Sequence, residues 1–368
     1  MRILYISNSI IPSRTANSIH VMKMCQAMAD NGHEVILIAP NQKKSYEKNI
    51  EDVYEYYGVR KNFKIKKLLY PNIYGRSVLY TLSICLFLIF NKKFNLIYGR
   101  FLFGCYIAAL LRNEVIFEAH DPIYERRNIE LIIFTKLTKS NFLKKIIVIS
   151  EELKKIFLKK SFLANSRIQV AHDGADQVKN LNYKIDLQGR KENFKVGYVG
   201  NLYSGKGIEV ISSIYDKVEN DIEFHIIGGK KKDIDFWKKK ISSDNVFFYG
   251  FIPQAKLSEY INSLDICLLP NQINLFLKGV GNISSYTSPL KLFDYMAHQK
   301  AIIASDLPVI REVLNKENSI LVKPHKSMEW ISAIEKLKNT NLRKLLSNKA
   351  LSDSYTYTWN KRVSDIIK

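Results

Sequence analysis

Residues 286–312 read YTSPLKLFDYMAHQKAIIASDLPVIRE, and this order of loop, helix, strand and turn decides the fold class of the second half of the chain. Apolar residues at helical spacing follow a cluster of turn residues, so Pro289 is expected at the first helical position. Backbone N–H groups at a helix start have no partner within the helix and can hold phosphate. Asp294 follows about one and a half turns later, where a carboxylate can accept hydrogen bonds from ribose hydroxyls. A nucleoside diphosphate fits both features, whereas the simpler interpretation is a capped helix with a solvated Asp.

The same stretch is similar to the SPLKLFEYMA…GKPIIASDLP…RE signature of retaining glycosyltransferases of family 4. Those enzymes use nucleotide sugars and have the two-domain GT-B fold. The resemblance implies an α/β chain with two Rossmann-like, doubly wound domains that face an interdomain cleft. It also implies a C-terminal helix that crosses back to the N-terminal domain, with Trp359 and Arg362 at matching places.

Length and composition set the outer limits of the interpretation. At 368 residues the chain exceeds what one hydrophobic core usually supports, so two domains are expected. The longest apolar run, residues 78–90, has 13 residues and is too short to span a bilayer. No secretory signal is evident in MRILYISNSI, so cytoplasmic residence is the default expectation. The four cysteines form no Cys-x-x-Cys pair, which argues against a metal or a disulfide framework.

The formal charge of +21 is concentrated in the first half of the chain, where residues 1–185 carry 29 Lys and Arg against 15 Asp and Glu. Basic residues beside the apolar run 78–90 favour attachment to an anionic membrane surface, since each contributes about 1 kcal/mol near anionic lipid. The expected location is therefore peripheral, at the inner face of the cell membrane. The alternative is a set of solvated, lysine-rich helical faces, and nucleic acid is disfavoured because no recognised motif accompanies the charge. The first cluster consists of Lys61, Lys64, Lys66, Lys67, Arg76, Lys92 and Lys93.

Apolar strand patterns alternate with helical patterns in both halves, which is typical of parallel sheets buried on both faces. Helices are expected at residues 18–31 and 78–90, and strands at 2–7, 34–40, 115–120 and 168–174. The polar, aperiodic segment 179–193 is the expected linker. The predicted domains are residues 1–185 for the acceptor, 186–352 for the nucleotide-sugar donor, and a C-terminal helix at 353–368 that packs on the first domain.

The loop GNLYSGKG at residues 200–207 follows the first strand of the second half, and ligands bind at the carboxyl ends of such strands. Its glycines allow close backbone approach and Lys206 supplies a positive charge, a combination that suits a diphosphate. Family 4 enzymes usually pair that Lys with an Arg, and both neutralise the leaving diphosphate. The resemblance therefore implies a catalytic role for Lys206, with Asn201 at the Arg position. Arg14 is a conjectured substitute for the missing charge.

Two stretches of the first half carry further candidates. Many relatives place a Gly-Gly pair in the loop that approaches the sugar phosphate, where this chain has Ala16 and Asn17; an ordinary helix cap at Ser18 is the alternative. The stretch FEAHDP resembles the family's Glu-x-His-Asp, whose His contacts the donor sugar, so His120 is the second catalytic candidate. Glu118 and Asp121 are expected either to orient it or an acceptor, or to satisfy backbone groups. No catalytic role is assigned to His20.

In the second half the resemblance implies a pocket for the nucleotide. Gly229 is expected to frame it, and Phe251 and Ile252 to bring backbone groups to the base. The family's Glu-x7-Glu motif has Tyr286 at its first position and Asp294 at its second. The role of binding the donor is therefore expected to fall to residues at the start of the helix. The residues expected there to hold phosphate and sugar are Thr287, Ser288, Pro289 and Leu290.

The resulting hypothesis is a metal-independent, hexosyl-type retaining transferase. It moves a sugar from a nucleoside diphosphate sugar, UDP favoured over GDP, to a cell-envelope glycan or lipid-linked acceptor, and it needs no further cofactor. Alternatives are a nucleotide-sugar epimerase or phosphorylase of the same architecture, and a non-catalytic nucleotide-sugar-binding protein. Base, sugar, acceptor, linkage and oligomeric state stay open.

Overall fold

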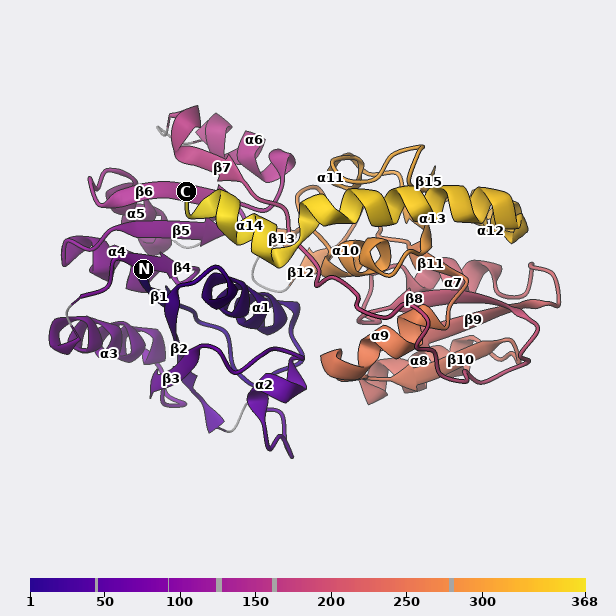
Figure 1. Ribbon diagram of the computed structural model, residues 1–368, viewed down its shortest axis with the longest axis horizontal. Coiled ribbons are helices and arrows are strands. Elements are labelled where there is room, and N and C mark those ends of the chain that lie inside the picture. The colour runs from indigo at the N-terminus through magenta and orange to yellow at the C-terminus, as the bar shows by residue number, and fades with distance from the viewer. Residues whose placement is uncertain (44–45, 92, 124–127, 161–163, 278–280) are drawn as a thin grey trace. The chain divides into compact units, whose positions relative to one another are not determined.

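The computed structural model describes residues 1–43, 46–91, 93–123, 128–160, 164–277 and 281–368. Contacts within the chain divide it into two compact units. Unit 1 comprises Met1–His172 and Trp359–Lys368, and unit 2 comprises Asp173–Thr358. Each unit is described by itself (Figure 1).

Unit 1 is built on a seven-stranded sheet in the order β3-β2-β1-β4-β5-β6-β7, and every pair of neighbouring strands is parallel. Tyr5 of β1 lies opposite Leu37 of β2 and Tyr98 of β4, so the apolar centre of the sheet is buried between helices. The strands are β1 (Arg2–Ile6), β2 (Glu34–Asn41), β3 (Lys64–Leu69), β4 (Leu96–Gly99), β5 (Val115–Ala119), β6 (Leu143–Val148) and β7 (Ile168–Val170).

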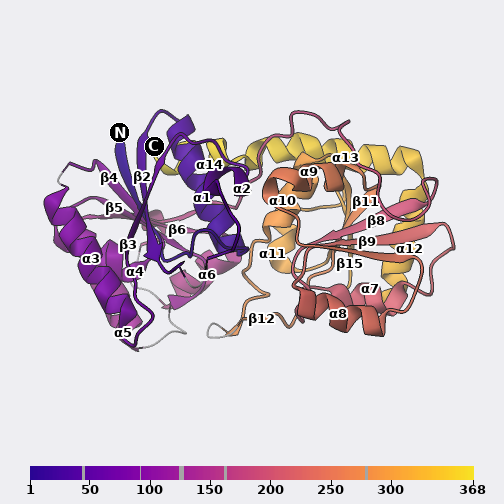
Figure 2. The same cartoon turned by 90° about the horizontal axis from the view of Figure 1, so that it is seen from below.

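Helices cover both faces of this sheet (Figure 2). Helix α4 packs against both α3 and α5, and α1 packs against the C-terminal helix α14. The helices of unit 1 are α1 (Ala16–Asp30), α2 (Val53–Tyr56), α3 (Arg76–Phe90), α4 (Leu102–Leu110), α5 (Asn128–Thr138), α6 (Glu151–Lys160) and α14 (Trp359–Ile366).

Unit 2 repeats the plan with a six-stranded parallel sheet in the order β10-β9-β8-β11-β14-β15. The strands are β8 (Phe194–Val199), β9 (Ile222–Ile227), β10 (Val246–Gly250), β11 (Ile266–Leu269), β14 (Ala301–Ser305) and β15 (Ile320–Val322), with a short antiparallel pair, β12 (Phe276–Leu277) and β13 (Gly281–Asn282). The helices are α7 (Ile208–Ile214), α8 (Lys231–Lys240), α9 (Gln254–Asn262), α10 (Leu290–Ala297), α11 (Pro308–Arg311), α12 (Ser327–Lys338) and α13 (Thr340–Ser354).

The predicted fold class of two doubly wound, Rossmann-like sheets is confirmed, and so is the return of the C-terminal helix. After α13 the chain leaves unit 2 at Thr358, and α14 packs on α1 of unit 1. Trp359, Val363 and Ile366 are buried there, and the Asn31 side chain donates to the carbonyl of Asn360. The amphipathic helix therefore buries its apolar stripe on unit 1.

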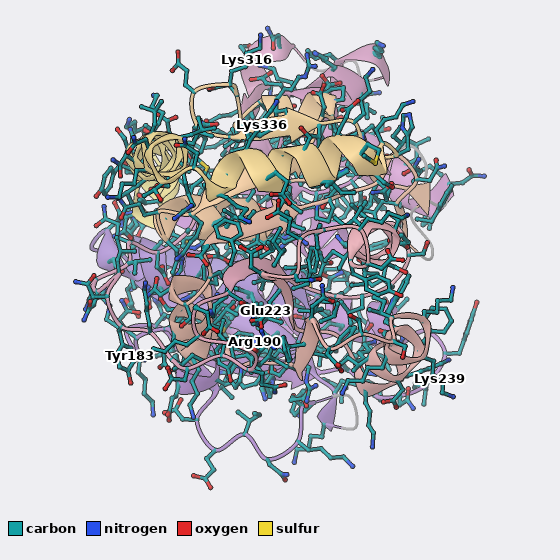
Figure 3. The ribbon with its side chains drawn as sticks, turned by 90° about the vertical axis from the view of Figure 1, so that its right-hand side faces the viewer. Tyr183, Arg190, Glu223, Lys239, Lys316 and Lys336 are labelled. Carbon is teal, nitrogen blue, oxygen red and sulfur yellow. The ribbon has the colours of Figure 1, made fainter. Side chains whose placement is uncertain are left out.

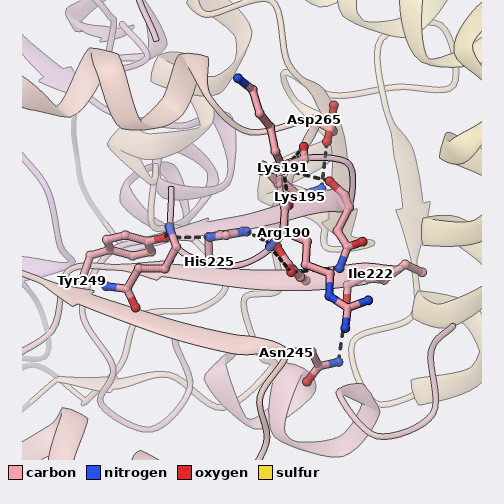
Figure 4. A network of polar contacts seen from close by, with 11 residues as sticks. Arg190, Lys191, Lys195, Ile222, His225, Asn245, Tyr249 and Asp265 are labelled. Carbon is pink, nitrogen blue, oxygen red and sulfur yellow. Dashed lines mark hydrogen bonds and ion pairs between the residues drawn. The ribbon is translucent and has the colours of Figure 1, made fainter. Parts of the chain in front are cut away.

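The polar segment expected as a linker is fixed to unit 2 (Figure 3). The Ile185 amide donates to the Ser263 hydroxyl, and the Arg190 amide donates to Oε1 of the buried Glu223, at 2.8 Å. Figure 4 shows the chain around Arg190 beside His225, whose Nδ1 lies 2.9 Å from the Tyr249 hydroxyl. Unit 2 accordingly begins at Asp173 and ends at Thr358, so it includes this segment. The domain roles assigned to residues 1–185, 186–352 and 353–368 stay predictions.

Two helix starts differ from the predictions. Helix α1 begins at Ala16, two residues early, because the Thr15 side chain caps it by accepting from the Ser18 amide. Helix α10 begins at Leu290, so Pro289 is its N-cap residue and not its first helical residue. Among the described residues, no helix combines the length and the apolar character needed to cross a bilayer.

Candidate functional site

The loops that follow β8, β9 and β10 are joined at the carboxyl edge of the sheet of unit 2. The Gly200 amide donates to the Ile227 carbonyl at 2.8 Å, and the Gly228 amide donates to the Gly250 carbonyl at 2.7 Å. Asn201, Gly229 and the pair Phe251 and Ile252 come directly after these three strands, so their backbones belong to one edge. This is the edge at which open parallel sheets bind ligands.

Glycine is required at two points of that edge. Gly207 has φ +100°, and a Cβ there would lie 2.1 Å from the Pro270 carbonyl oxygen. Gly228 has φ +114°, and its Cβ would lie 2.4 Å from the Gly200 carbonyl oxygen. Any side chain would push the loops apart, since such contacts are far below van der Waals distance and these φ values disfavour other residues.

Two lysines meet at this edge, and among the described residues neither forms an ion pair. The Nζ of Lys291, on the first turn of α10, lies 3.8 Å from the centre of the Tyr198 ring. It is buried and has no hydrogen-bond partner among the described residues. Burial, and then repulsion from Lys206, hold the pKa of Lys291 well below its usual value. Burial also lowers the pKa of Lys206 to about 8. The protonated forms of both lysines are thus disfavoured in the ligand-free protein.

Two backbone amides of the glycine-bearing loop already donate hydrogen bonds to a side chain of the same segment. The Glu209 carboxylate accepts from the amides of Gly205 at 3.1 Å and Gly207 at 3.2 Å. These two amides were expected to approach a phosphate, and a side-chain anion holds them instead. The positive charge that remains for a ligand comes from the side chains of Lys206 and Lys291.

Helix α10 is held in place by strand β8 and by the loop that precedes the helix. The Thr287 amide donates to the Ile283 carbonyl, and the hydroxyl of Tyr295 accepts from the Val199 amide at 2.8 Å. Thr287, Ser288, Pro289, Leu290 and Asp294 are half-buried, whereas Tyr286 is buried. The carbonyl of Asp294 accepts from the His298 amide and closes the last turn of the helix, while the bond between Val199 and Tyr295 holds the helix against strand β8.

In unit 1 a buried carboxylate gathers the candidates at the end of β5. Oε1 of Glu118 lies 2.5 Å from Nε2 of His120, 2.9 Å from Nε2 of His20 and 2.9 Å from Nη2 of Arg362. The Tyr98 hydroxyl donates to its other oxygen. Although burial alone would raise the pKa of Glu118, the Arg362 charge and the two imidazoles hold it well below its usual value. Glu118 is therefore ionised and orients these rings.

His120 is neutral in this setting. Burial, and then the positive charge of Arg100, lower its pKa to about 3. A neutral imidazole that faces a carboxylate through Nε2 carries its proton there, so Nδ1 is left as a hydrogen-bond acceptor. The backbone amide of Arg100 donates to the Ile6 carbonyl. Nη1 of the Arg100 side chain is buried and has no hydrogen-bond partner among the described residues. A cation thus lies near the neutral ring.

The loop before α1 is ordered by hydroxyl groups. The Tyr57 hydroxyl donates to the Ser13 carbonyl at 2.8 Å and accepts from the Ser13 amide at 2.6 Å. Arg14, the conjectured substitute cation, forms an ion pair with Glu47 at 2.5 Å, so its charge is balanced within unit 1. Ala16 is exposed and Asn17 and Asp121 are half-buried on this unit, and Oδ1 of Asn17 has no partner in the described part of the chain.

The sequence pattern indicated no role for the side chains of Lys291 and Arg100, which lie in these clusters. No catalytic role was expected for His20. In the structure the His20 ring lies edge-on to His120, with centroids 4.7 Å apart, so it packs beside the candidate. The available signal for Lys291 was its place inside SPLK, one residue into a helix whose start was expected to hold phosphate.

Two family models match the chain. Residues 18–178 match Glycosyltransferase Family 4, and residues 193–340 match Glycosyl transferases group 1. An uncharacterized glycosyltransferase of Methanocaldococcus jannaschii is 27% identical over 235 residues, which are 61% of this chain and 57% of that protein. An uncharacterized 41.2 kDa protein in the cps region of Klebsiella pneumoniae is 24% identical over 29% of each chain. The matched region thus spans little more than half of the archaeal relative.

Solved structures match over nearly the whole length. Anabaena HepE in complex with UDP aligns with a TM-score of 0.73 at 14% identity, over 100% of this chain and 98% of that one. The lipopolysaccharide outer core galactosyltransferase WaaB aligns with a TM-score of 0.67 at 13% identity, over 100% and 98%. At such identities the likeness shows the fold alone. Together with the two family models, it shows that the chain belongs to the family 4 glycosyltransferases with the GT-B fold.

Proposed function

We propose that the chain transfers a sugar, with retention of configuration, from a UDP-sugar to a cell-envelope glycan or lipid-linked acceptor. The single observation that carries the proposal is the pair Lys206 and Lys291. Two lysine amino groups lie at this edge of unit 2, and that of Lys291 is buried and has no hydrogen-bond partner in the part of the chain that the structure describes. Burial disfavours the protonated form of such a lysine, and an anion bound beside it would favour that form again.

The proposed anion is the diphosphate of the donor. As the bond to the sugar breaks, negative charge grows on the β-phosphate, and preorganised cations in a site that excludes water stabilise it strongly. The lysines thus take the part that a metal ion plays in other transferases. Thr287, Ser288 and the amides at the start of α10 would add hydrogen bonds to phosphate and sugar, and Asp294 would accept from the ribose.

His120 has the proposed role of contacting the sugar. Its neutral state suits a group beside a carbon that becomes positively charged, because an imidazolium would repel that charge. Glu118 would fix the proton on Nε2 and so keep Nδ1 as acceptor. We further propose front-face attack, in which the departing phosphate takes the proton of the acceptor hydroxyl.

The choice of UDP and of the acceptor rests on what similar proteins bind and act on. HepE is solved with UDP and with UDP-glucose, which supports UDP as the nucleotide. WaaB is named a lipopolysaccharide galactosyltransferase, and the Klebsiella protein is placed in a cps region, which supports a cell-envelope glycan. Metal independence, the hexosyl group, a cytoplasmic location and the domain roles at 1–185, 186–352 and 353–368 remain parts of this proposal.

A non-catalytic nucleotide-sugar-binding protein is the second candidate, because Asn201 and Tyr286 replace residues that are charged in relatives. The decisive experiment compares wild type with His120→Ala. Thermal shifts with UDP, GDP and ADP are measured, and release of UDP from UDP-sugars is followed with and without membrane glycolipid extract. Retained UDP binding with loss of UDP release in the variant supports transfer. No UDP release by wild type with any sugar would favour the binding protein, and no nucleotide-dependent shift would overturn both.

A further inference from the structure

Helix α3 presents an apolar stripe to solvent. Its buried side holds Tyr80, Ile84, Phe87 and Leu88, which pack on unit 1. The opposite side follows the helical spacing of four, four and three residues and is apolar as well. Its side chains are 43% to 81% exposed, and they are Val78, Leu82, Leu86, Ile89 and Phe90.

Exposed apolar side chains also occur on the neighbouring helices. Leu110 is exposed at the end of α4, which packs against both α3 and α5. Ile129 and Ile132 are exposed on α5, with Lys136 one further turn along the same side. The residues just before α3 add Ile73 and the fully exposed Tyr74. We call this set of exposed side chains the α3 face. Monomeric soluble proteins rarely expose a continuous apolar surface without a partner.

The charge around the α3 face has one sign. No Asp or Glu occurs between Glu55 and Glu114, whereas ten Lys and Arg do. Lys66 lies beside the helix, with Nζ 4.9 Å from the centre of the Phe87 ring, and Lys64 is exposed on the same side of the edge strand β3. Arg76 begins α3. Lys92, which belongs to the predicted cluster, lies outside the described residues.

We propose that the α3 face docks on the surface of an anionic bilayer, with its apolar side chains in the acyl boundary and its basic side chains at the lipid phosphates. The helix has 15 residues, or about 22 Å, and one of its sides is buried in the core of unit 1. It would therefore lie parallel to the bilayer surface and not cross it. A second copy of the chain is disfavoured as the occupant, because two such faces would bring like charges together without compensation. The inference stands on unit 1 alone and does not depend on the proposed donor.

The test is flotation of the full chain with vesicles of phosphatidylcholine alone and of phosphatidylcholine with 30% phosphatidylglycerol. One variant removes the stripe, Leu82→Gln with Leu86→Gln and Ile89→Gln, and another removes charge, Lys64→Gln with Lys66→Gln and Arg76→Gln. Controls make the same kinds of change at exposed positions of unit 2, with two apolar residues in Met328→Gln with Leu345→Gln and three lysines in Lys232→Gln with Lys336→Gln and Lys344→Gln. Circular dichroism melts establish that each variant folds.

Wild type is expected to float with the anionic vesicles only, and raising salt from 50 to 500 mM should reduce the bound fraction at least fivefold, since exposed charges are then screened. Each α3-face variant should lose at least tenfold in vesicle partition, and each control should change less than twofold. Equal flotation of the stripe variant and wild type would overturn the proposal. Absence of wild-type binding would also overturn it. One such case is a wild-type protein that does not float and sediments as a dimer, where the stripe variant sediments as a monomer.

Discussion

Nη2 of Arg362, on the C-terminal helix, lies 2.9 Å from Oε1 of Glu118 at the end of β5. The same guanidinium donates through Nε to the His172 carbonyl at 2.9 Å and through Nη2 to the Ala171 carbonyl at 3.2 Å. The return of α14 to unit 1 thus supplies the charge that keeps Glu118 ionised, and Glu118 orients His120. A residue near the end of the chain positions a candidate catalytic side chain.

Replacing Arg362 should therefore cost both stability and activity. Arg362→Met leaves Glu118 buried without its main counter-charge, and breaking a buried pair from one side costs about 3–5 kcal/mol. Urea unfolding should show that loss. Lys361→Met, which removes an exposed pair with Asp365, should cost less than about 0.5 kcal/mol.

A double variant separates pairing from packing. If Glu118 is the reason for the loss, Arg362→Met combined with Glu118→Gln should be more stable than the sum of the single losses predicts, by about 1–3 kcal/mol. Additive losses would show that Arg362 acts through packing and its backbone bonds alone.

The pH dependence of UDP affinity should report Lys206. Its pKa of about 8 in the free protein means that the ammonium loses its proton as pH rises through 8, while the ligand phosphates are already ionised above pH 7. A bound diphosphate favours the protonated form, so affinity should fall between pH 7 and 9 and binding at pH 8.5 should take up protons. Calorimetry in two buffers of different ionisation enthalpy measures that uptake.

Lys206→Arg is the matched variant for this measurement, because an arginine stays charged throughout the range. Its affinity should fall less with pH than that of wild type. An identical pH profile for the two proteins would assign the dependence to another group.

The glycine-bearing loop should tolerate no side chain at Gly207. Gly207→Ala places a methyl group against the Pro270 carbonyl at a φ of +100°, so we expect a loss of more than about 2 kcal/mol and a weaker UDP-induced thermal shift. Gly32→Ala is the control, because Gly32 has φ +81° but open space around its Cβ. It should cost about 1 kcal/mol and leave the shift intact. Equal losses would mean that φ alone decides.

The repeated strand patterns predicted both sheets, because central parallel strands buried on both faces read as apolar runs. Edge strand β3 was missed, since KIKKLL has lysines where a central strand would have apolar residues. The start of α1 was misplaced because Thr15, Ser18 and Ser13 can each cap a helix, and only the folded loop selects among them. Capping chemistry is local, but the choice between caps depends on tertiary contacts.

For the candidate sites, the sequence predicted the residues that lie at the ends of strands but not their distant partners. Glu118 lies at the end of β5, His120 follows that strand and Lys206 follows β8, so the strand pattern alone placed them at carboxyl ends of strands. Arg362 pairs with Glu118 across 244 positions, and nothing in the local sequence indicates that partner. Lys291 is likewise buried against Tyr198 of strand β8, and the helical pattern around Lys291 gives no sign of that contact.

Lys291→Met provides the most direct test of the central claim that unit 2 holds an anion with two lysines. Methionine keeps the length of the side chain and removes the buried, unpartnered amino group, so the ligand-free variant should be more stable than wild type, by about 1–3 kcal/mol. Lys344→Met, at an exposed position of α13, should change neither stability nor binding by a measurable amount.

The deciding measurement is the unfolding temperature of wild type and Lys291→Met with and without UDP. The account predicts a raised temperature for the ligand-free variant and no UDP-induced shift, against a clear shift in wild type, since saturation at 100 times Kd adds about 2.7 kcal/mol. A variant that is less stable than wild type without ligand, yet shifts as much with UDP, would contradict it.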